Sequence, residues 1–126
     1  MRFLSPEWTA EVAAVLAENT DILDSAEGTD CRLNIDVTSS DTDTARMNLR
    51  ITPDGVVLRP GPDSDPDVRL SYDYDTAARI ARRELMPGEA FRAGLITTDG
   101  DLGKLTGLEE VLDEVAWAMN EVECVY

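Results

Sequence analysis

Apolar and polar residues alternate one by one along two neighbouring stretches of the chain, residues 31–38 and 47–52. A side-chain period of two is typical of a β-strand that buries one face and exposes the other. The run between them, residues 39–44, consists of serine, threonine and aspartate and predicts an exposed hairpin connection. These two strands require a sheet with one covered face, so the remaining segments must supply the cover.

Two further strands extend this sheet. Pro53-Asp54-Gly55 is a tight-turn sequence, so residues 56–59 should return antiparallel to the second strand. The proline-rich stretch that follows can form neither a helix nor a central strand, and it predicts a surface loop. Alternation resumes over residues 68–74, which predicts a fourth strand with Tyr72 and Tyr74 on the covered face.

Amphipathic helices are predicted near both ends of the chain. Ser5 is suited to cap a helix and Pro6 to occupy its first position, and this helix should extend to about Asn19. Between Leu108 and Val122, apolar residues recur at alternating spacings of four and three, flanked by acidic residues. Each helix therefore has an apolar face that can pack on the sheet.

Two short helices and a fifth strand are predicted between the fourth strand and the last helix. An aspartate at the end of the fourth strand, Asp73 or Asp75, can cap the first of these helices. Pro87 opens the second, which Gly94 terminates. Residues 95–98 then predict a short fifth strand that ends in an Asp-Gly-Asp turn.

Length and composition predict one domain over residues 1–126, with 43% apolar residues. No segment approaches the roughly 18–20 uninterrupted apolar residues of a membrane span, and the first residues lack the apolar segment of a secretory leader. We therefore expect a cytoplasmic location. In that compartment Cys31 and Cys124 are expected to be reduced thiols, with a disulfide as the alternative.

The chain carries 26 acidic and 11 basic residues and no histidine, which gives a net charge of −15. This charge repels phosphate backbones and anionic lipid headgroups, so we expect no nucleic-acid partner and no stable membrane association. It would attract a basic protein partner. The lack of histidine excludes Ser-His-Asp and Cys-His catalysis, and the glycine spacing fits no phosphate loop. We expect neither a metal site nor a cofactor.

Three segments of the chain, in order, resemble the sterol carrier protein 2 domain. They are the opening Phe3–Trp8, the passage from strand to helix at Tyr74–Ala78, and residues 89–105 with their helix, strand and Gly-Asp turn. The order of the predicted elements is similar to that domain over nearly the whole chain.

The resemblance implies an α+β fold, with a five-stranded, antiparallel-rich sheet covered on one face by helices. It also implies a cavity between the two layers that holds sterols, fatty acyl chains or other hydrophobic molecules, and it implies no cofactor. Carried onto this sequence, the sheet side of the cavity comprises Met47, Leu49, Val56, Leu58, Leu70, Tyr72 and Ile96. The helical side comprises Phe91, Leu112, Val115 and Met119.

This chain departs from the pattern of that domain at three points. Thr98 falls on a normally apolar inner position, where it is expected to meet a polar group of a ligand. Arg83 stands where a glycine is common. Strong acidity replaces a more basic character, which favours sequestration of a hydrophobic metabolite over transfer by collision with membranes.

We therefore expect a non-catalytic protein that sequesters or carries a hydrophobic small molecule, such as a fatty acyl, sterol-like, polyketide or terpenoid compound. One alternative is a cavity-based enzyme or accessory cyclase, in which Tyr72, Thr98 or a desolvated Asp73 with a raised pKa acts on a hydrophobic intermediate. Another alternative is an interaction module with a filled core and a basic partner. Density for a ligand, or an empty volume above roughly 300 Å³ between sheet and helices, would argue for a pocket in place of this last alternative.

Overall fold

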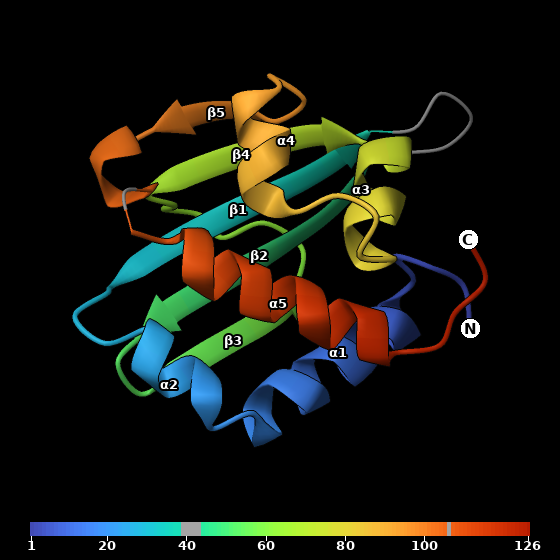
Figure 1. Cartoon of the computed structure of the whole chain (residues 1–126), viewed down its shortest axis with the longest axis horizontal. Coiled ribbons are helices and arrows are strands. Elements are labelled where there is room, and N and C mark those ends of the chain that lie inside the picture. The colour runs from blue at the N-terminus through green and yellow to red at the C-terminus, as the bar shows by residue number, and fades with distance from the viewer. Residues whose placement is uncertain (39–43, 106) are drawn as a thin grey trace.

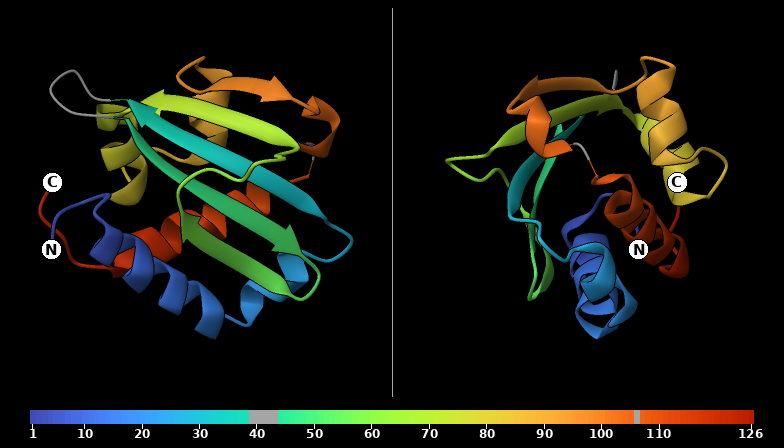
Figure 2. Two further views of the ribbon diagram at one scale, coloured as in Figure 1. Left: turned by 180° about the vertical axis from the view of Figure 1, so that it is seen from behind. Right: turned by 60° about the vertical axis from the view of Figure 1, so that its left-hand side comes forward.

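A sheet with the strand order β3-β2-β1-β4-β5 forms one layer of the molecule, and helices cover one of its faces (Figures 1 and 2). The computed structural model describes residues 1–38, 44–105 and 107–126. Most of the expected hairpin connection, residues 39–43, therefore lies outside the described residues. The strands are β1 (Cys31–Thr38), β2 (Ala45–Thr52), β3 (Gly55–Pro60), β4 (Val68–Asp73) and β5 (Thr97–Gly100).

Strand pairing is antiparallel except at the centre of the sheet. β1 pairs antiparallel with β2, β2 with β3, and β4 with β5, whereas β1 and β4 run parallel, with Leu33 opposite Val68. The predicted α+β fold with a five-stranded, antiparallel-rich sheet is confirmed. The apolar residues of β1 are buried at every second position, as the alternation predicted.

The helices are α1 (Pro6–Glu18), α2 (Asp21–Ser25), α3 (Tyr74–Ala81), α4 (Pro87–Arg92) and α5 (Glu109–Glu121), with a short 3-10 helix, η1 (Leu102–Leu105). The start of α1 is as expected: the Ser5 hydroxyl accepts a hydrogen bond from the Trp8 N–H at 3.2 Å. Asp73 caps α3 by accepting from the Thr76 N–H at 2.8 Å. α2 and η1 were not predicted. No described helix is long and apolar enough to cross a lipid bilayer.

The helical layer divides over the two halves of the sheet. α1 packs on β3, and α5 lies beside α1 and crosses the middle of the layer (Figures 1 and 2). α4 and α3 lie over the β4 half of the sheet and contact α5. The core between the layers is closely packed around side chains such as Trp8, Leu33 and Val111, none of which is exposed.

Two sequence predictions near the ends of strands were wrong. The fourth strand ends at Asp73, and Tyr74 begins α3 because Asp73 caps that helix; the Tyr74 ring packs edge-on against Phe3 with the ring centroids 5.5 Å apart. The fifth strand occupies Thr97–Gly100 in place of residues 95–98, so its last two residues are strand and not turn. The backbone of Gly100 is left-handed (φ 105°), and a side chain there would overlap the Asp67 carbonyl.

Candidate functional site

An apolar cavity lies between the sheet and helices α4 and α5, with a volume of about 40 Å³. Its floor comes from β1, β2 and β4, and its roof from α4 and α5, with one residue each from α3 and from the segment before β5. Ligand pockets for small molecules typically measure roughly 300–1,000 Å³, whereas one water needs roughly 10–15 Å³. In this structure the cavity therefore has space for water molecules but is much smaller than a typical ligand pocket. The lining residues are Ile35, Leu49, Leu70, Tyr72, Ile80, Pro87, Phe91, Ile96, Leu112, Val115, Ala116 and Met119.

Eight of the residues predicted for the ligand site line this cavity: Leu49, Leu70, Tyr72, Phe91, Ile96, Leu112, Val115 and Met119. Four predicted residues do not: Met47, Val56, Leu58 and Thr98. The structure thus brings most of the predicted set together around one space. Their role in binding stays a prediction.

The residues outside the lining belong to other parts of the same sheet face. Val56 and Leu58 are buried on the edge strand β3, which α1 covers instead of α4 or α5. Met47 is buried opposite Ile35 in the neighbouring strand. Thr98 is half-buried opposite Leu70 and lies beyond the cavity wall.

Four lining residues were not predicted for the site: Ile35, Ile80, Pro87 and Ala116. Ile35 follows the alternation of β1 and lies next to both Met47 and Leu70, so its central place was visible once the strand order was known. Ala116 is 1% exposed on α5. Its small side chain leaves unfilled the space that a larger residue would occupy.

Tyr72 supplies the one hydroxyl group among the residues that line the cavity. Within the part of the chain that the structure describes, no group forms a hydrogen bond with this hydroxyl. Burial raises the pKa of Tyr72 well above its ordinary value, because the phenolate would lose its hydration. Tyr72 is half-buried and therefore remains a neutral O–H donor beside an apolar lining.

Asp73 does not have the environment expected of a catalytic acid. Its carboxylate is exposed, and the hydrogen bond from the Thr76 N–H lowers its pKa. The expectation of a desolvated Asp73 with a raised pKa is therefore wrong. The carboxylate stays ionised near neutral pH and serves as the cap of α3.

A surface hollow of about 260 Å³ adjoins the cavity, and the two share Phe91 and Leu112. Phe91 is half-buried on α4 and Leu112 is buried on α5. Across this hollow Arg92 Nη1 lies 3.5 Å from Glu109 Oε1, and both side chains are largely exposed. An exposed ion pair of this kind contributes only about 0.2–1 kcal/mol. Phe91 and Leu112 thus form a wall that the two spaces have in common.

The outer surface between α4 and α5 is acidic. A second hollow, of about 440 Å³, is lined by Glu109, Glu110 and Asp113 together with Met86, Pro87 and Gly88. Gly88 lies so close to Glu109 that a Cβ at this position would overlap the carboxylate. No cluster of three or more Cys, Asp or Glu side chains in the described ranges is arranged to hold a metal ion.

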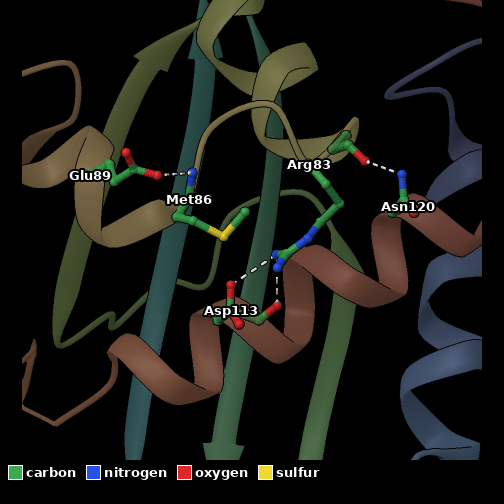
Figure 3. A network of polar contacts seen from close by, with 6 residues as sticks. Arg83, Met86, Glu89, Asp113 and Asn120 are labelled. Carbon is green, nitrogen blue, oxygen red and sulfur yellow. Dashed lines mark hydrogen bonds and ion pairs between the residues drawn. The ribbon is translucent and has the colours of Figure 1, made fainter.

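Arg83 connects the segment before α4 to α5. Figure 3 shows its side chain reaching from the end of α3 to Asp113, with Nη1 2.8 Å from Oδ1. The guanidinium also lies over the Trp117 ring, 4.2 Å from its centroid. Asn120 donates to the Ala81 carbonyl at 3.1 Å. The N-terminal side of α4 is therefore anchored to α5, whereas its C-terminal side has the exposed pair of Arg92 and Glu109.

The sequence model of the SCP-2 sterol transfer family matches residues 12–113 of the chain. No curated protein matches the sequence of this chain.

Several solved structures have the same arrangement of strands and helices. A crystal structure of sterol carrier protein 2 superposes with a TM-score of 0.78 at 16% identity, over 97% of this chain and 100% of that chain. The solution structure of a conserved hypothetical protein, possibly a sterol carrier protein, from Thermus thermophilus gives 0.80 at 16% identity, over 99% and 92%. The solution structure of palmitated SCP2L2 from Aedes aegypti gives 0.62 at 18% identity, over 89% and 95%. At such identities the likeness establishes the fold.

Proposed function

The chain belongs to the SCP-2 sterol transfer family, and we propose that it binds a hydrophobic small molecule in the cavity between the sheet and helices α4 and α5. In this proposal the protein sequesters or carries that molecule without transforming it. The observation that carries the proposal is the cavity itself: its lining is apolar apart from Tyr72 and comes from both layers of the fold.

Burial of hydrocarbon supplies the driving force for binding. Each methylene removed from water contributes about 0.8 kcal/mol, so a chain of roughly 16 carbons gains on the order of 10 kcal/mol before immobilisation costs. Micromolar affinity requires about 8 kcal/mol. Burial of only part of such a chain is therefore sufficient for micromolar affinity.

Binding requires the cavity to open, because 40 Å³ does not hold a lipid chain. Separation of Phe91 from Leu112 would join the cavity to the hollow of about 260 Å³ outside it. Among the described residues, a weak exposed ion pair between Arg92 and Glu109 opposes this movement at the surface. The contact of Arg83 with Asp113 holds the other side of α4 in place. We therefore propose that α4 swings outward from α5 at its C-terminal side.

The names of the structural relatives support a hydrophobic ligand. One is a sterol carrier protein, and another, from Aedes aegypti, is described as palmitated. This chain shares their fold and matches the model of the SCP-2 sterol transfer family. We propose a ligand of the same broad kind here.

A cavity-filling substitution tests the proposal. Ala116→Val adds two methyl groups to the cavity wall, so the affinity for the neutral fluorescent probe N-phenylnaphthylamine should fall at least about tenfold. Ala118→Val is the matched control: Ala118 is 2% exposed on the same helix but lies outside the cavity lining. Both changes carry the same helix-propensity cost of a β-branched residue. An equal loss of probe affinity in both variants, or no probe binding by the native protein, would contradict the proposal.

A further inference from the structure

The cavity offers a ligand one side-chain hydrogen-bond donor and no charge. Its other lining side chains are hydrocarbon, apart from the thioether of Met119. Tyr72 lies near the end of β4, opposite Val37, so its hydroxyl belongs to the β4 side of the cavity. Tyr72 is half-buried, and its hydroxyl can donate a hydrogen bond to a ligand that supplies an acceptor.

The Tyr72 hydroxyl acts as a donor and not as an anion at any physiological pH. Burial raises its pKa, and within the described residues it has no hydrogen-bond partner. A neutral acceptor, such as an ester, ketone or ether oxygen, complements such a group. A ligand without an acceptor gains no hydrogen bond from this hydroxyl.

A carboxylate finds no compensation inside the cavity. None of the lining residues is cationic. Moving an ionised carboxylate into such surroundings is strongly unfavourable when no cation pairs with it. A fatty-acid anion is therefore disfavoured with its head inside.

A carboxylate is also disfavoured at the outer surface. Of the described cations near this surface, Arg83 pairs with Asp113 and Arg92 with Glu109. Glu110 adds a further negative charge to the same surface. A fatty acid bound with its head outward would therefore face acidic groups, on a chain whose net charge is −15.

We infer that this cavity selects neutral hydrophobic molecules with a hydrogen-bond acceptor, which the Tyr72 hydroxyl binds, and discriminates against fatty-acid anions. The inference rests on the proposed function, since it names the class of ligand for the same cavity. It distinguishes this chain from a carrier of free fatty acids.

Three ligands of equal chain length test the inference: methyl dodecanoate, dodecanoate and dodecane. Each competes with N-phenylnaphthylamine at neutral pH and low salt. Methyl dodecanoate should bind at least about tenfold more tightly than dodecanoate. Tyr72→Phe should weaken methyl dodecanoate roughly three- to tenfold, as expected for one hydrogen bond, and leave dodecane within about twofold.

A surface variant separates the two parts of the argument. Glu110→Gln should improve the binding of dodecanoate about two- to fivefold and leave methyl dodecanoate unchanged. If the native protein binds the probe, but the ester and the anion compete with equal affinity, the selectivity is overturned and the proposed function stands. An unaltered ester affinity in Tyr72→Phe would overturn the role of the hydroxyl. Failure of the native protein to bind the probe at all would overturn the proposed function itself.

Discussion

Arg83 Nη1 lies 2.8 Å from Asp113 Oδ1, and this contact fixes the segment between α3 and α4 on α5. The Arg83 side chain is only 14% exposed, and its Nε has no hydrogen-bond partner among the described residues. The backbone at Arg83 is left-handed, with φ 64°. Glycine adopts this conformation without strain, whereas an arginine there carries strain. This chain places an arginine there and uses its side chain to hold the roof of the cavity.

Removing either partner of this pair should have unequal effects on stability. Asp113→Ala leaves a mostly buried guanidinium without its carboxylate and should lower the free energy of unfolding by about 2 kcal/mol. Arg83→Gly removes the charge together with the left-handed strain of about 1–2 kcal/mol, so it should cost less. Urea unfolding of the two variants measures the difference. A larger loss in Arg83→Gly would show that the stacking on Trp117, and not the ion pair, dominates.

The exposed pair between Arg92 and Glu109 should affect the rate of ligand entry more than affinity. Arg92→Ala removes up to about 1 kcal/mol that opposes the opening between α4 and α5, so probe association should be about two- to fivefold faster. The affinity should change less than about threefold. Stopped-flow fluorescence measures both quantities. Arg59→Ala, an exposed change on β3, is the control, and equal rates in the two variants would exclude this route of entry.

The two cysteines should differ in reactivity. Both thiols are free, and Cys31 is buried whereas Cys124 is partly exposed. Burial, with a smaller contribution from the nearby Asp67 carboxylate, raises the pKa of Cys31 to about 11. Only the thiolate reacts with iodoacetamide, so Cys31 should react roughly a hundredfold more slowly than an ordinary free cysteine. Mass spectrometry of the Cys124→Ser variant, folded and in urea, measures this rate. Rapid labelling of the folded variant would show that β1 opens locally.

Asp67 should make the protein sensitive to acid. The Arg32 N–H donates to its carboxylate at 2.9 Å and Lys104 Nζ lies 3.3 Å away, so the pKa of Asp67 is lowered. A lowered pKa in the folded state contributes stability above the unfolded pKa of about 3.9, and this contribution disappears as the pH falls through the folded pKa. Asp67→Ala should therefore cost about 1 kcal/mol near neutral pH and much less in strong acid. A cost that does not change with pH would contradict this account.

The central strands could be predicted from the sequence because burial on one face imposes a period of two. Leu33, Ile35 and Val37 are all buried in β1, and each lies opposite an apolar or aromatic residue of a neighbouring strand. The edge strand β5 was displaced by two residues in the prediction. Its position is set by pairing, Thr98 opposite Leu70, and three of its four residues are exposed, so apolar periodicity carries no information there.

The cavity could be predicted only in part, since alternation identifies a covered face but not which helix covers which strand. Val56 and Leu58 satisfy the same pattern as Leu70, yet α1 packs over them. Ala116 was not predicted as a lining residue, because a small residue on a helix is as consistent with close helix packing as with a cavity. The conformation of Tyr74 depended on the cap formed by Asp73, for which Asp75 was an equal candidate.

The most direct test of the central claim is to measure nuclear Overhauser contacts between bound N-phenylnaphthylamine and the methyl groups of the protein. We predict saturation at one equivalent of probe, with contacts to Leu49, Leu70 and Val115, which lie on both sides of the cavity. Contacts confined to exposed side chains such as Val57 or Leu102, with none to these three, would contradict the account.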